Sequence, residues 1–245
     1  MAESLSLSLS LDREPCIVLS VVPYNDGRRV VRVLGETLGT VALWVTEGKG
    51  KNRQVGKWHP GAMLELRGVS RKGSEGLVRF KEARRTQIPV AMFQDVRRSA
   101  VAFFLCELVG KLFPEEIAHP EIYALFHEAL IRVEEEEQVG WIHAEFMGQL
   151  IALMGLAPPS SELAGADVLD LQSGEWKHAM GTAEDHLPPP LSQWFMDLTG
   201  TATRDFTATF SERKELIKGQ LRYLGHQLGG LREIKSYEVL EQVFE

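Results

Sequence analysis

The residues with the clearest chemical pattern are cations in the first quarter of the chain. Seven arginines and lysines lie between residues 28 and 57. They are Arg28, Arg29, Arg32, Lys49, Lys51, Arg53 and Lys57. Guanidinium and ammonium groups at this density are typical of surfaces that bind nucleic-acid phosphates. The alternative is that the glycine-rich part of this stretch is a solvated turn.

Two tryptophans lie among these cations. Along residues 40–46 the odd positions are Val or Leu, which predicts that they face a core and that Trp44 points to the opposite face. Trp58 directly follows Lys57. Unpaired bases stack on flat rings, so both tryptophans are candidate stacking platforms. The alternative for Trp44 is packing against a neighbouring helical domain.

Known catalytic motifs are missing from the chain. The segment from Gly50 to Gly56-Lys57 resembles a phosphate-binding loop, but five residues separate the glycines where four are needed. Trp58 also stands where such a loop needs Ser or Thr. No GxSxG, HExxH or CxxC pattern occurs. The sequence therefore predicts a protein that is not an enzyme and needs no cofactor.

A metal centre is not expected either. The two cysteines, Cys16 and Cys106, lie among apolar neighbours and are predicted to be buried and reduced. The irregular stretch 157–190 holds His178 and His186 but no cysteine, which is too few ligands for zinc. The run Glu134 to Glu137 is interpreted as a solvated helix junction.

The order of the elements divides the chain near Ile88-Pro89. Before it, β-branched runs separated by glycine turns predict five strands, at about 15–23, 28–34, 40–46, 62–68 and 76–83. Five short strands suit an OB-fold barrel, with a small sandwich or SH3-like barrel as the alternative. The faces of strands 2 and 3 of an OB-fold form the usual strand-binding groove, which places the cations and Trp44 together.

After Pro89 the apolar period becomes helical. Helices are predicted at 92–112, 121–133, 139–154 and 212–228, with a last helix through Phe244 capped by Ser236. A short hairpin is expected around 168–176. The predicted fold class is α+β in two domains: a tail or edge strand at 1–14, an OB-fold at 15–88, and an all-α helical domain at 89–245 with the irregular loop 157–190.

Charge is distributed unequally along the 245 residues. Residues 1–90 carry a net charge of +6 and residues 91–245 a net charge of −13. This asymmetry predicts a nucleic-acid-facing part joined to a part with another role. No apolar run is long enough to span a membrane, and the N-terminal segment has no basic region typical of a secretory signal. A cytoplasmic protein is expected.

Several segments together resemble the bacterial recombination mediator family RecO. The strongest is 88–108, which is similar to the start of the helical domain in the branch of that family without a zinc motif. Weaker similarities follow in order: Pro23-Tyr24 with the basic strand, the loop from Gly39 through Lys51, the helix 146–156 and the segment 228–236. The resemblance covers residues 15 to 245.

The resemblance implies an N-terminal OB-fold, a helical C-terminal domain and a role in DNA repair. It implies binding and annealing of single-stranded DNA, and loading of recombinase onto DNA coated by single-strand-binding protein. The implied partners are RecR and the acidic C-terminal tail of single-strand-binding protein, and the implied location is the nucleoid. The alternative is an enzyme accessory subunit or hydrolase whose barrel packs on the helices without binding nucleic acid.

An acidic tail that ends in an apolar ring needs a hydrophobic pocket with a cation at its rim. Cations are scarce after residue 90, and basic residues usual in the family are replaced by Ala144 and Glu145. The expected pocket lies between the helices 121–133 and 139–154. Its predicted members are Phe126, Arg132, Ile142, His143 and Phe146. The alternative is that these residues only complete the helical core.

Overall fold

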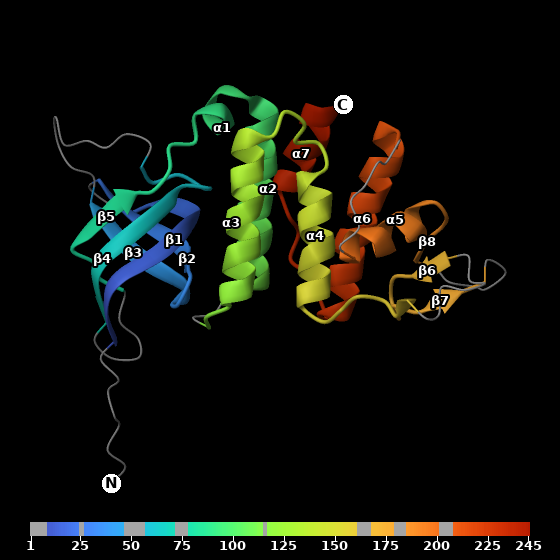
Figure 1. Cartoon of the computed structure of the whole chain (residues 1–245), viewed down its shortest axis with the longest axis horizontal. Helices are drawn as coiled ribbons and strands as arrows, with labels where there is room; N and C mark the ends of the chain where they lie inside the picture. The colour runs from blue at the N-terminus through green and yellow to red at the C-terminus, as the bar shows by residue number, and fades with distance from the viewer. Residues whose placement is uncertain are drawn as a thin grey trace, which may run out of the picture. The chain divides into compact units, whose positions relative to one another are not determined.

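The computed structural model describes residues 9–24, 27–46, 57–71, 78–114, 117–160, 168–178, 185–200 and 208–245. The chain forms two compact units, Met1–Glu135 and Glu136–Glu245 (Figure 1). A five-stranded antiparallel sheet comes first, and seven helices follow in the described residues. The predicted α+β class is thus confirmed.

The first unit is built on the strands of this sheet. They are β1 (Leu9–Pro23), β2 (Arg28–Gly35), β3 (Gly39–Thr46), β4 (Met63–Arg71) and β5 (Glu82–Arg85). Their order is β3-β2-β1-β4-β5. β1 is the longest strand and pairs with β2 on one side and with β4 on the other. The pairing with β4 begins at Leu9.

Leu43 of β3 and Val78 form one isolated parallel bridge, which is a first step towards closing this sheet into a barrel. No ladder of paired residues joins the two edge strands within the described residues, so the closed barrel stays a prediction. Alternate residues of β2 and β3, among them Val31, Leu43 and Val45, contribute to one buried apolar cluster. The alternation expected for 40–46 is therefore confirmed.

The turn between β2 and β3 is held by a buried carboxylate. Glu14 accepts hydrogen bonds from the backbone N–H groups of Thr37 (2.8 Å) and Leu38 (3.0 Å) and from the Thr37 hydroxyl (2.5 Å). A side chain at Gly35 would approach Glu14 Oε1 to 2.5 Å. The turn needs glycine there, because the carboxylate occupies the space.

Three helices complete the first unit: α1 (Val90–Gln94), α2 (Val96–Leu112) and α3 (Pro120–Glu135). α2 packs on β1, where the buried Cys106 thiol lies 3.6 Å from the carbonyl oxygen of Val18. Burial raises the pKa of both Cys16 and Cys106, so these thiols stay protonated. The expectation that both cysteines are buried is confirmed.

Glu134 has a structural role that sequence analysis did not predict. Its carboxylate accepts the backbone N–H groups of Ala91 (2.7 Å) and Met92 (2.9 Å) at the start of α1. The interpretation of Glu134 as a solvated junction residue was wrong, because a helix start needs acceptors for its free N–H groups. These contacts join α1 to α3, and α2 packs on β1, so the compact units divide after Glu135 rather than at residue 88. The functional domain limits stay predictions.

The second unit contains four helices and a small three-stranded sheet. The helices are α4 (Ile142–Leu153), α5 (Leu191–Thr199), α6 (Phe210–Gln227) and α7 (Ser236–Phe244). The strands are β6 (Val168–Asp170), β7 (Trp176–Lys177) and β8 (His186–Leu187), in the order β7-β6-β8. The hairpin expected around 168–176 is confirmed, whereas α5 was not predicted.

The starts of two helices in this unit differ from the sequence-based expectation, which placed one helix start at residue 212 and a cap at Ser236. Thr209 and Glu212 form a capping box at the start of α6. Ser236 is the first residue of α7 rather than its cap, and Lys235 precedes it without a side-chain capping bond. None of the helices in the described parts combines the length and apolar character needed to cross a bilayer.

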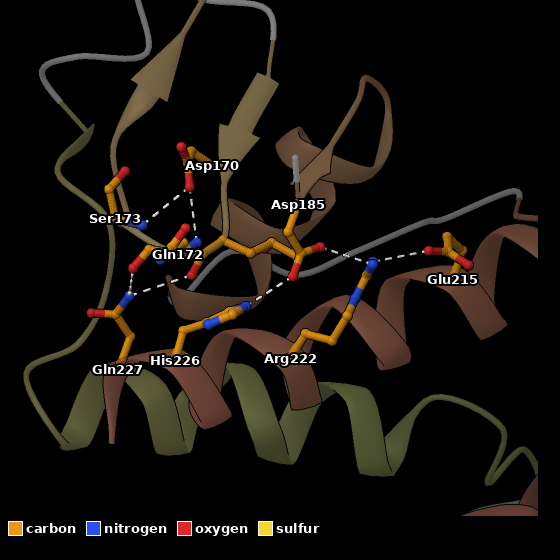
Figure 2. A network of polar contacts seen from close by, with 9 residues as sticks. Asp170, Gln172, Ser173, Asp185, Glu215, Arg222, His226 and Gln227 are labelled. Atoms are coloured by element: carbon orange, nitrogen blue, oxygen red, sulfur yellow. Dashed lines mark hydrogen bonds and ion pairs between the residues drawn. The ribbon is translucent and has the colours of Figure 1, made fainter. Parts of the chain in front are cut away.

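The small sheet is fastened to α6 by polar contacts (Figure 2). The Asp185 carboxylate lies 2.9 Å from Arg222 and 2.9 Å from His226, which are one turn apart on the helix. Gln227 donates to the carbonyl of Gln172 at 3.1 Å, and Tyr223 donates to that of Leu156 at 2.6 Å. One face of α6 thereby holds Leu156, Gln172 and Asp185 in place.

Candidate nucleic-acid interface

The outer face of β1, β2 and β3, opposite the apolar cluster, presents three rows of side chains. The cross-strand pairs Ser20–Arg32–Ala42 and Val22–Val30–Trp44 give the first two rows. Arg28 pairs with Thr46, and the Tyr24 N–H bonds to the Arg28 carbonyl, which gives the third. The face therefore alternates basic, aromatic and apolar groups.

Two exposed aromatic rings meet on this face. Tyr24 and Trp44 have ring centroids 4.7 Å apart and ring planes at 84°. Tyr24 is 58% exposed and Trp44 is 37% exposed. The neighbouring Val22 is also 56% exposed. Such a group of exposed apolar side chains indicates a binding surface.

Arg28 and Arg32 lie on the same face as this ring pair. They occupy the rows before and after Trp44 on the same face of β2. Among the described residues, no carboxylate forms an ion pair with either of them. Arg29 has the opposite parity, shared with the buried Val31, and is half-buried. The structure thus brings Arg28 and Arg32 together with Trp44, but places Arg29 on the other face.

Two arginines on β4 and β5, by contrast, form ion pairs with glutamates. Arg67 lies 2.7 Å from Glu65 and Arg84 lies 2.8 Å from Glu82. In the register of the two strands Glu65 is opposite Arg84 and Arg67 is opposite Glu82. Hydrogen bonds from these arginines hold the pKa of both glutamates below the usual range. These two arginines therefore offer a phosphate less attraction than arginines without an ion pair.

Lys57 and Trp58 are fixed near β5. The Lys57 ammonium donates to the carbonyl oxygen of Ala83 and lies 5.8 Å from the Trp58 ring centroid. Burial lowers the pKa of Lys57. Trp58 packs on the apolar cluster and on Phe80, with centroids 5.8 Å apart. None of the contacts in the described parts of the chain joins these two residues to the Tyr24–Trp44 pair.

The remaining predicted cations, Lys49, Lys51 and Arg53, lie outside the described residues. Their assignment to a binding loop stays a prediction. The basic surface that the structure describes is therefore smaller than the one expected from the sequence.

The residues of the predicted tail pocket belong to both units. Phe126 and Arg132 lie on α3 in the first unit, and Phe126 is fully buried. Ile142, His143 and Phe146 lie on α4 in the second unit and are buried. Burial, aided by Arg213, lowers the pKa of His143 to about 3. His143 is therefore uncharged near neutral pH and is not the cation that a carboxylate would need.

Sequence analysis missed Tyr24 as a member of the candidate site because of a bulge in β1. Val18 pairs with Val33, but Ser20 pairs with Arg32, so Leu19 is an extra residue. A bulge shifts the alternation by one. Strict alternation from the buried Cys16 and Val18 would place Tyr24 inside. Its only sequence signal is its position between Pro23 and a basic strand.

Comparisons with known proteins find similarity to a class of DNA repair proteins. A family model described as "Recombination protein O C terminal" matches residues 93–167. A DNA repair protein RecO from Azobacteroides pseudotrichonymphae genomovar. CFP2 is 26% identical over 243 residues, which is 96% of this chain and 100% of that protein. The RecO of Flavobacterium psychrophilum is 24% identical over 233 residues, 93% of this chain and 97% of that protein.

The similarity extends over both compact units and agrees with the family-level resemblance found in the sequence. A RecO of Bacteroides fragilis is 26% identical over 158 residues, 63% of this chain and 65% of that protein. The chain is thus similar to RecO DNA repair proteins over nearly its full length, and residues 93–167 match the C-terminal family model.

Proposed function

We propose that the chain is a recombination mediator that binds and anneals single-stranded DNA without catalysis. In this role it helps to load recombinase onto DNA coated by single-strand-binding protein. Its protein partners are RecR and the acidic tail of single-strand-binding protein, and it acts at the nucleoid in the cytoplasm. The DNA repair role of its relatives supports this proposal.

One observation carries the proposal: the exposed Tyr24 and Trp44 rings share one sheet face with Arg28, in the row of Tyr24, and Arg32, in the row beyond Trp44. A single strand exposes both phosphates and base faces, and its binding needs cations and flat rings together. The outer face of β1–β3 supplies both. On β4 and β5, by comparison, Arg67 and Arg84 each have a neighbouring carboxylate that reduces their attraction for a phosphate.

The test is a salt titration of binding to a fluorescent single-stranded oligonucleotide, measured by anisotropy. Each phosphate contact contributes about −0.7 to the slope of log K against log salt for single strands. The double variant Arg28→Ala/Arg32→Ala should therefore reduce the slope by about 1.4. The matched control is Arg67→Ala/Arg84→Ala, which removes two arginines from the ion-paired half and should change the slope less.

Equal loss in both double variants would move the site away from the outer face of β1–β3. Failure of the wild-type chain to bind at low salt would favour the accessory-subunit reading. The mediator role is tested by the annealing of complementary strands with and without single-strand-binding protein. The wild-type chain should accelerate annealing in both cases, and the Arg28→Ala/Arg32→Ala variant should do so more weakly.

A further inference from the structure

We propose that the crossed Tyr24 and Trp44 rings select unstacked, thymine-rich single strands, and that Tyr24 is the residue that determines this preference. The inference rests on the proposed function, because it assigns a substrate preference to the same surface. It follows from the angle between the rings, their exposure and their place in the strand register.

The two rings reach each other diagonally across β2. Trp44 is in the row of Val30, and Tyr24 is in the row of Arg28, one row further along the same face. The centroid distance of 4.7 Å places the rings in direct contact, and the angle of 84° sets them edge to face. Tyr24, the more exposed of the two at 58%, presents the larger free surface.

This geometry is incompatible with a stacked strand that uses both rings. Consecutive bases in a stacked strand are nearly parallel, whereas bases lying flat on the two rings would be nearly perpendicular. A strand must therefore break the stack between two bases to use both platforms. The break costs more where bases stack strongly, so sequence preference arises from stacking strength rather than from base-specific hydrogen bonds.

The cations suit such a turned strand. Arg28 lies in the row of Tyr24, and Arg32 lies on the far side of Trp44. A backbone that passes over the rings therefore meets a guanidinium group at each end of the pair. A duplex keeps its bases paired inside, so it reaches the same arginines but not the ring faces, and extruding a base costs a few kcal/mol.

The test compares the affinities of dT12, dA12 and a 12-base-pair duplex for the full chain at one salt concentration. The two single strands carry equal charge, so phosphate contacts do not separate them. We expect dT12 to bind at least about threefold more tightly than dA12, since stacking differences of about 1 kcal/mol per step correspond to fold-changes of this order. The duplex should bind more weakly than dT12.

Two substitutions at Tyr24 separate its ring from its hydroxyl group. Tyr24→Phe keeps the ring and should keep both the dT12 affinity and the preference for dT12 over dA12. Tyr24→Ala should weaken dT12 binding by about fivefold or more and bring the two affinities together. Phe103→Ala, which removes another exposed ring from α2, is the control and should change neither. An unchanged thermal midpoint excludes unfolding as the cause.

The outcomes distinguish this inference from the proposed function. Binding of neither single strand by the wild-type chain would overturn the proposed function itself. Equal binding of dT12 and dA12 would overturn the preference and leave the DNA-binding surface in place. A preference that survives in Tyr24→Ala would show that another group determines it.

Discussion

Arginines with the same side chain have different surroundings on the same sheet. Arg28 and Arg32 lie beside aromatic and small neighbours, whereas Arg67 and Arg84 each lie within 3 Å of a glutamate carboxylate. Neighbouring charges decide how much of a cation's field is available to a phosphate. Histidines differ in the same way: the buried His143 has a strongly lowered pKa, while His226 remains at the surface beside Asp185.

The lowered pKa of His143 makes stability depend on pH. The unfolded chain binds a proton at this histidine below about pH 6.5, but the folded chain does so only near pH 3. The contribution of His143 to the free energy of unfolding is therefore fully present above about pH 6.5. It is lost progressively as the pH falls from about 6.5 towards about 3. Between about pH 7.5 and about pH 5 the loss should be about 2 kcal/mol.

Urea unfolding of His143→Leu should remove most of this pH-dependent loss, because leucine has no proton to bind. The exposed His178→Leu is the control and should keep the wild-type dependence. An identical pH dependence in His143→Leu and the wild-type chain would contradict the assignment.

At the scale of elements, a bulge in β1 determines which side chains reach the outer face, and a close contact determines how α4 and α5 pack. The extra residue Leu19 turns Val22 and Tyr24 to the outer face, where they meet Trp44. In the second unit α4 and α5 touch where Gly148 leaves no side chain between them. An added Cβ at Gly148 would lie 2.3 Å from the carbonyl oxygen of Leu198. No local sequence pattern predicts either the bulge or the close backbone contact.

Gly148→Ala should lower the stability of the second unit by about 1–3 kcal/mol, because α5 must move away from α4. The matched control is Gly110→Ala in α2, where the new Cβ would meet Leu19 at an ordinary 3.8 Å. That variant should gain up to about 1 kcal/mol from helix propensity. Thermal melting measures both, and a stabilised Gly148→Ala would refute the close contact.

At the scale of the whole molecule, charge and packing divide the chain at different places. The basic excess ends near residue 90, but the first compact unit extends to Glu135. The helices α1 to α3 belong to the sheet unit because α2 packs on β1 and Glu134 binds the start of α1. The similarity to RecO proteins spans both units, since these relatives match nearly the full chain.

Chelation should leave the whole molecule unchanged. The chain has two cysteines, and both are buried with raised thiol pKa values, so neither is available as a zinc thiolate. Dialysis against a chelator should change neither the thermal midpoint nor oligonucleotide affinity. Elemental analysis that finds about one zinc per chain, together with a lower midpoint after chelation, would contradict this prediction.

Local patterns in the sequence were enough for the fold class and for part of the site. Alternation along 40–46 placed Trp44 opposite Val41 and Val45, and the change from a period of two to a helical period separated strands from helices. The cations on β2 were evident from their positions alone. These features depend on residues that are neighbours in the chain, and the periods of apolar residues in strands and helices are visible in the sequence.

Tertiary structure alone decided which of these residues meet. Tyr24 reaches Trp44 because one extra residue in β1 shifts the phase of the strand. Arg29 is separated from Arg28 by strand parity, and Lys57 is drawn to the carbonyl of Ala83. The carboxylates of Glu14 and Glu134 find backbone partners 23 and 43 positions away. Register, burial and such distant partners depend on contacts between remote segments, and a local period carries no information about them.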